Sequence, residues 1–75
     1  MVYKYKVQLE TMNDVNEFVA LVNVIHDDVN LTTTDGRYTI SAKSLLGVIA
    51  TTDWSDTWVV SESERLYNLI KRWVI

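Results

Sequence analysis

The chain has 75 residues, with ten acidic and seven basic side chains and a formal net charge of −3. This length makes a single domain, residues 1–75, and the acidic balance argues against nucleic-acid binding, since clustered basic residues supply most of the affinity for phosphate backbones. The absence of cysteine excludes disulfides and thiolate metal sites. No apolar run approaches the ~20 residues of a membrane span, and no apolar signal region follows Met1, so we expect a cytoplasmic protein that binds no membrane.

The first third of the chain predicts a strand followed by a helix. Residues 2–10 alternate between apolar and polar side chains, as in a half-buried strand. Thr11 and Asp14 form a capping-box pattern, although Asn13 is an alternative cap. The next apolar residues recur at helical spacing and predict a helix over 13–25. They are Val15, Phe18, Val19, Val22 and Ile25.

The middle of the chain predicts a hairpin and a short helix. Apolar and polar residues alternate from Val29 to Thr34 and again from Tyr38 to Ser41, which predicts two strands. Asp35-Gly36 between them suits a two-residue type I′ turn. Ser44 is placed to cap a helix over 45–50.

The last third predicts a buried strand and a helix. Residues 51–56 are polar and predict a loop, and the apolar run 57–60 predicts a fourth strand with Trp58 in the core. Ser61 and Glu64 form a second capping-box pattern before a helix that continues to residue 74, with Trp73 on its buried face. The order β-α-β-β-α-β-α predicts an α+β fold in which three helices cover one face of a four-stranded antiparallel sheet, an open-faced β-sandwich.

The segments Asp35-Gly36-Arg37 and Ala42-Lys43-Ser44-Leu45-Leu46-Gly47-Val48-Ile49 resemble the HPr phosphocarrier family of the bacterial phosphotransferase system. In that family a hairpin with an Asn-Gly or similar turn leads into a Lys-Ser-apolar-apolar-Gly-apolar stretch, which opens a short second helix. The resemblance is strongest over residues 28–50, and the element order extends it over the chain. It implies an HPr-like open-faced sandwich in a bacterial protein.

The resemblance also implies that the family's active site is degenerate here. Members that carry phosphate place a histidine, one further residue and Arg-Pro at the start of the first helix. Thr11 and Asn13 stand near the positions of that histidine and arginine, and the proline is absent. Since a phosphohistidine needs an imidazole nitrogen, we expect a protein that is not an enzyme. No other catalytic arrangement emerges from the sequence.

The family's regulatory surface is better preserved. Ser44 matches the position that a regulatory kinase phosphorylates in Firmicute members, whose phosphoserine form binds a transcriptional regulator. The alternative is that Ser44 is only a helix cap. Leu45, Leu46 and Ile49 resemble the apolar patch that docks partner proteins, although all three are alternatively core residues. Trp54 either folds over the core or contacts a partner.

His26 is the only histidine, and its place after the first helix favours a solvent-facing side chain. Adjacent residues such as His26-Asp27-Asp28 seldom converge on one metal ion, so we expect no metal and no cofactor. Three functions remain open. The first is a non-catalytic HPr-like domain that acts through protein–protein contact, with Ser44 as its regulatory site and a transcriptional regulator or phosphotransferase-system protein as its partner. The second is a residual phosphocarrier, and the third is a small structural or oligomer-forming domain.

Overall fold

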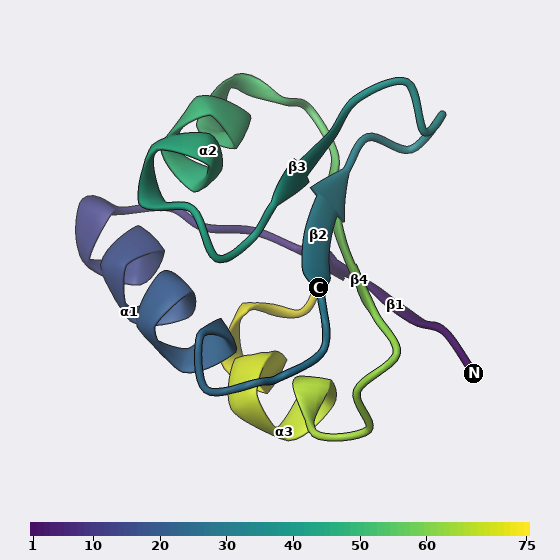
Figure 1. Ribbon diagram of the computed structural model, residues 1–75. Coiled ribbons are helices and arrows are strands. Elements are labelled where there is room, and N and C mark those ends of the chain that lie inside the picture. Colours follow the sequence, from purple (N-terminus) through teal and green to yellow (C-terminus); the bar gives the residue numbers. More distant parts are fainter.

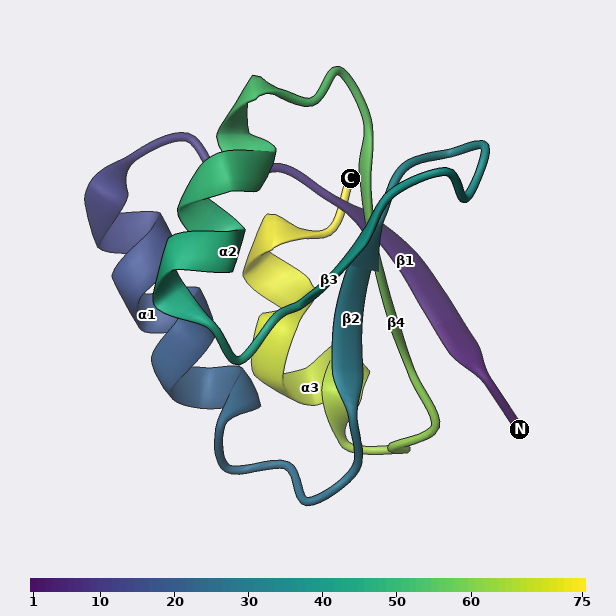
Figure 2. The same cartoon turned by 45° about the horizontal axis from the view of Figure 1, so that its top comes forward.

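The computed structural model describes all of residues 1–75 and has a four-stranded antiparallel sheet in the order β1-β4-β2-β3. Three helices lie together on one face of this sheet, and the other face is uncovered (Figures 1 and 2). The elements, in chain order, are β1 (Tyr3–Val7), α1 (Met12–Val22), β2 (Val29–Thr32), β3 (Thr39–Ser41), α2 (Leu45–Ala50), β4 (Thr57–Ser61) and α3 (Leu66–Ile70). Short 3₁₀ turns follow α2 at Thr51–Asp53 and α3 at Lys71–Trp73. The predicted fold class and element order are confirmed.

Strand β4 holds the sheet together because it pairs on both sides. Val59 lies opposite Tyr5 of β1 and opposite Leu31 of β2. Residues directly opposite one another share a face, so these three side chains point toward the helices. The alternation seen in the sequence of β1 thus places its tyrosines on the helix-covered face.

The core lies between this face and the helices. Every strand except β3 supplies at least one buried residue to it. Its thirteen buried residues are Val7, Val15, Phe18, Val22, Ile25, Val29, Leu31, Ala42, Val48, Val59, Leu66, Ile70 and Trp73. Phe18 of α1 meets Trp73 edge-on, with ring centroids 5.6 Å apart. All five predicted core positions of the first helix pack here, although Val19 is only partly buried.

The C-terminal residues cover part of the β1 edge. The Gln8 N–H donates to the Trp73 carbonyl at 2.9 Å, and the Ile75 N–H donates to the Lys6 carbonyl at 3.0 Å. Val74 forms an isolated bridge with Val7 between these two bonds. The opposite edge of the sheet, β3, has no such cover.

Two predictions about local structure are wrong. Asp35-Gly36 does not form a type I′ turn, because only Gly36 has a positive φ (75°) and that turn requires one at both central residues. The hairpin instead closes through the bond from the Thr33 N–H to the Tyr38 carbonyl, which gives a wider loop. The first helix ends at Val22 rather than at residue 25, although Ile25 remains buried.

Two predictions about the last third are also wrong. Ser61 does not cap the last helix, because it belongs to β4 and is buried opposite Tyr3. Trp58 is not a core residue, since β4 turns it to the uncovered face. There its indole N–H donates to the Thr34 hydroxyl at 2.9 Å, and Lys4 stacks on its ring.

None of the helices has both the length and the apolar character needed to span a lipid bilayer.

Candidate functional site

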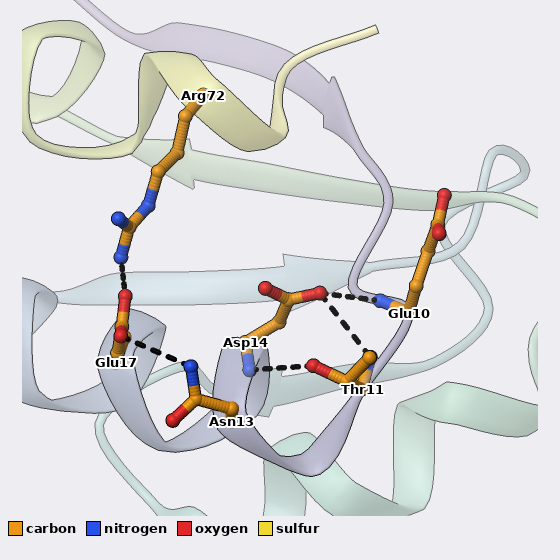
Figure 3. A network of polar contacts seen from close by, with 6 residues as sticks. All are labelled: Glu10, Thr11, Asn13, Asp14, Glu17 and Arg72. Carbon is orange, nitrogen blue, oxygen red and sulfur yellow. Dashed lines mark hydrogen bonds and ion pairs between the residues drawn. The ribbon is translucent and has the colours of Figure 1, made fainter.

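The N-terminus of α1 is closed by a reciprocal set of hydrogen bonds (Figure 3). The Asp14 N–H donates to the Thr11 hydroxyl at 3.0 Å, and the Thr11 N–H donates back to the Asp14 carboxylate at 3.2 Å. The Glu10 N–H adds a third bond to the same carboxylate oxygen at 3.1 Å. Thr11, and not Asn13, is therefore the cap, and the capping box that the sequence predicts is confirmed.

This network places a carboxylate of the chain itself at the positive end of the α1 dipole. The Trp73 side chain first, and then the backbone N–H groups of Glu10 and Thr11, hold the pKa of Asp14 below its ordinary value of 3.8. Asp14 is therefore anionic at neutral pH. A second anion at this helix end would meet its negative charge and would find two of the nearby donors already engaged.

Asn13 belongs to a second polar chain beside the first. Its amide donates to Glu17 at 3.1 Å, and Glu17 forms an ion pair with Arg72 (Figure 3). The Arg72 guanidinium in turn lies 4.1 Å from the centre of the Trp73 ring. Thr11 and Asn13 are thus engaged in structural contacts, and neither supplies an imidazole nitrogen or a guanidinium.

His26 lies beyond the other end of α1 and is exposed. It lines a shallow hollow of about 440 Å³ with acidic neighbours, Asp27, Asp28 and Glu62, and Ser44 is not part of that hollow. Its side chain is solvent-facing, as predicted. No three His, Asp or Glu side chains are grouped so that they would hold a metal ion.

Ser44 caps α2, as predicted, and is exposed. Its hydroxyl accepts the Gly47 N–H at 3.2 Å. The residue before it ties the start of α2 to the end of α1, because the Lys43 ammonium donates to the Ile25 carbonyl and the Asn23 amide donates to the Lys43 carbonyl. The backbone that precedes Ser44 is therefore held in place by its contacts with the end of α1.

The apolar residues of α2 divide between core and surface. Val48 is fully buried, and Ile49 is half-buried against the core. Leu45 and Leu46 are 42% and 80% exposed. We call Ser44, Leu45 and Leu46 together the α2 patch. Only two of the three predicted docking residues on α2 face solvent.

Trp54 is half-buried and packs against the core, while its ring also lies 6.5 Å from that of Tyr38. It lines a hollow of about 510 Å³ between the end of β1 and residues 52–57, next to the Lys6–Asp56 ion pair of 2.9 Å. Sequence reasoning did not single out the exposure of Tyr38, which is 58%. The position of Tyr38 immediately after the hairpin loop is the sequence feature that could have indicated this exposure.

The charge distribution distinguishes this part of the molecule. Residues 36–52 contain two basic side chains, Arg37 and Lys43, and no acidic one, although the chain as a whole is acidic. The two ion pairs of the protein, Lys6–Asp56 and Arg72–Glu17, involve neither of them. The segment that carries the α2 patch is thus locally positive.

Comparison with known proteins gives one structural likeness. No protein-family model matches the sequence, and no curated protein matches it. The structure is similar to the crystal structure of a phosphocarrier protein HPr from Bacillus anthracis str. Ames, with a TM-score of 0.66 and 20% sequence identity over 95% of this chain and 90% of that one.

The fold is HPr-like. At this level of identity the likeness concerns the arrangement of strands and helices. The functional assignment has to come from the residues that the HPr-like scaffold presents.

Proposed function

We propose that this chain is a non-catalytic HPr-like domain that acts through protein–protein contact at the α2 patch, with Ser44 as its regulatory phosphorylation site. The observation that carries the proposal is the exposure of Leu46 beside the exposed Ser44 hydroxyl, at the start of a helix that is anchored to α1. Its partner is a transcriptional regulator or a phosphotransferase-system protein, as the resemblance to HPr proteins suggests.

The α1 end supports the non-catalytic part of this proposal. A phosphocarrier of the HPr type needs an imidazole there, and the only histidine lies beyond the opposite end of α1. The Asp14 carboxylate adds a negative charge at the helix terminus that would stabilise a phosphate, and it accepts the Glu10 and Thr11 N–H groups just before the helix. The distance of the histidine and this negative charge both support the proposal that the chain carries no phosphohistidine at this position.

The charge around Ser44 supports the regulatory part. A phosphoserine brings about −1.5 to −2 charges, which destabilise a segment that already carries carboxylates. Residues 36–52 carry none, and Lys43 precedes the serine directly. The added charge thus meets a locally positive segment.

Two labelling reactions test these parts separately. We expect the serine kinase of the HPr family to label the wild type with phosphate from ATP and to leave Ser44→Ala unlabelled. Ser55→Ala removes an exposed serine from another loop and should be labelled like the wild type. Equal labelling of Ser44→Ala and the wild type would exclude Ser44 as the site.

The second reaction uses phosphoenolpyruvate and the first enzyme of the phosphotransferase system. We expect no label on the chain. If label does transfer and is lost in His26→Gln, the chain is a phosphocarrier and the non-catalytic proposal is wrong.

The patch itself is tested with Leu46→Asp against purified candidate partners, namely a phosphotransferase-system enzyme and an HPr-binding transcriptional regulator. Val24→Asp is the matched control, because Val24 is likewise an exposed apolar residue but lies after α1. Loss of binding in Leu46→Asp alone is the expected result. Equal binding of both variants would remove α2 from the contact surface.

A further inference from the structure

The two edges of the sheet are protected very differently. The β1 edge carries Lys4 and Lys6, and the C-terminal residues pair with it from Lys6 to Gln8. Charged side chains and covering segments are the usual devices that keep a sheet edge from pairing with another chain. The β3 edge, Thr39–Ser41, is short, contains no charged residue and has no strand paired along its outer side.

The hydrogen bonds of the hairpin show which backbone groups of β3 face outward. The Ala42 N–H donates to Val29 at 2.8 Å, and the Thr33 N–H donates to Tyr38 at 3.2 Å. In an antiparallel pair the bonding residues alternate, so Tyr38, Ile40 and Ala42 bond to β2. The backbone groups of the odd-numbered residues, Arg37, Thr39 and Ser41, therefore point away from the sheet.

Two of these outward groups are already satisfied within the chain. The Arg37 N–H donates to the Asp35 carboxylate at 3.0 Å, and the Ser41 carbonyl accepts the Ser44 N–H at 3.2 Å. Four groups then remain: the Arg37 carbonyl, both groups of Thr39 and the Ser41 N–H.

We propose that the β3 edge pairs with the same edge of a second copy of this chain, with Thr39 opposite Thr39. In this antiparallel register Arg37 lies opposite Ser41 of the second copy. The two Thr39 residues exchange two hydrogen bonds, and each Ser41 N–H donates to an Arg37 carbonyl. In a regular ladder the Arg37 N–H would also bond to the Ser41 carbonyl of the second copy. Both of these groups already have partners within their own chain, so this register leaves no outward backbone group of residues 37–41 unpaired.

The side chains also fit this register. Tyr38, which is 58% exposed, lies opposite the half-buried Ile40 of the second copy on the helix-covered face. Arg37 lies opposite the uncharged Ser41 of the second copy, so no two like charges face one another in this register. The contact is isologous, and its twofold axis is perpendicular to a joined sheet of eight strands. The self-complementarity of residues 37–41 is what identifies the occupant as a second copy. The inference does not rest on the proposed function of the α2 patch.

Proline substitution tests the edge without removing a backbone hydrogen bond within the chain; Thr39→Pro also loses the long hydrogen bond of 3.4 Å from the Thr39 hydroxyl to the Thr32 hydroxyl. Thr39→Pro deletes an outward N–H, which edge strands tolerate. Lys4→Pro is the matched control, because the bonds of Lys6 and Gln8 to the C-terminus show that even-numbered residues of β1 also point outward. The readout is the molar mass by light scattering at concentrations up to about 1 mM, since interfaces of small area associate weakly.

We expect the mass of the wild type and of Lys4→Pro to rise with concentration toward twice the 8.7 kDa of one chain, and that of Thr39→Pro to stay at 8.7 kDa. Circular dichroism checks that both variants are folded. The amide resonances of Thr39 and Ser41 should shift with concentration in the wild type. A wild type that remains monomeric overturns the proposal, even if its β3 edge binds an extended peptide of another protein. A Thr39→Pro variant that dimerises like the wild type also overturns it.

Discussion

Replacing Ser44 with alanine tests how much of its role is structural. The variant loses the bond from the Gly47 N–H to the serine hydroxyl, which is 3.2 Å long and exposed. An N-cap of this kind contributes about 0.5–1 kcal/mol in a solvent-exposed setting. A domain of this length has an unfolding free energy of about 4–11 kcal/mol, so Ser44→Ala should remain folded, and its loss of kinase labelling can be interpreted.

The assay is urea unfolding followed by tryptophan fluorescence. With a slope of about 1 kcal/mol per molar urea, expected at the low end for so short a chain, the midpoint of Ser44→Ala should fall by about 0.5–1 M. Ser44→Asp restores an oxygen acceptor and adds a negative charge to a segment with no carboxylates. Its midpoint should therefore recover to within about 0.3 M of the wild type, because aspartate caps helices about as well as serine.

Two results would refute this reasoning. An unchanged midpoint in Ser44→Ala would mean that the hydroxyl does not cap α2. A midpoint of Ser44→Asp below that of Ser44→Ala would mean that negative charge is unfavourable at this site. The second result would count against phosphorylation as a regulatory event here.

Three further predictions concern other parts of the chain. Gly47→Ala should raise the free energy of unfolding by up to about 1 kcal/mol through helix propensity. Its new methyl group meets the Ile40 Cδ1 atom at 3.3 Å, and this end of a side chain can rotate away; a lower urea midpoint would show that it cannot. Because the pKa of Asp14 is held below 3.8, its contribution to stability is complete above that pH and is lost as the pH falls through the lowered pKa. The urea midpoint of Asp14→Asn should thus vary less with pH below about pH 4 than that of the wild type. Arg72→Ala should lower the free energy of unfolding by no more than about 1 kcal/mol, chiefly through its stacking on Trp73, and added salt should change this loss little, since exposed ion pairs contribute little.

The features that the sequence predicts well are those that neighbouring residues determine. The capping box of Thr11 and Asp14 joins residues three positions apart, and the cap of Ser44 reaches only to Gly47. Both depend on helix geometry alone. The element order follows for the same reason, because each segment shows a clear period of two or of 3.6 residues.

The errors arise where a distant segment decides the outcome. The run Trp58-Val59-Val60 is apolar throughout, so it cannot show which residues face the core; pairing with Tyr5 and Leu31 assigns that face to Val59. Ser61 matches a capping box as well as Thr11 does. Its pairing with Tyr3 nevertheless keeps it in β4, and the last helix begins only at Leu66.

A distant contact also decides which of the candidate docking residues on α2 are exposed and which are half-buried. Helical spacing on α2 is compatible with burial of any two of its apolar residues, and the sequence leaves open which ones. The anchoring of Lys43 to the end of α1 sets the rotation of the helix, so that Val48 is buried and Leu46 is exposed. This exposure depends on a contact between residues 18 positions apart, which no local pattern predicts.

The core of the HPr-like fold does not depend on the chemistry of its first helix end. Phe18 and Trp73 pack on the buried side of α1, whereas the Thr11 cap lies on the exposed side. A histidine at this end can therefore be absent without a cavity in the core, provided that another group satisfies the free N–H groups of the helix. The Thr11 hydroxyl accepts the Asp14 N–H, and the Asp14 carboxylate stabilises the same helix end by accepting the Glu10 and Thr11 N–H groups and by placing a negative charge at the positive end of the dipole. The contacts at this helix end are thus compatible with the HPr-like fold and with the proposed function at the start of α2.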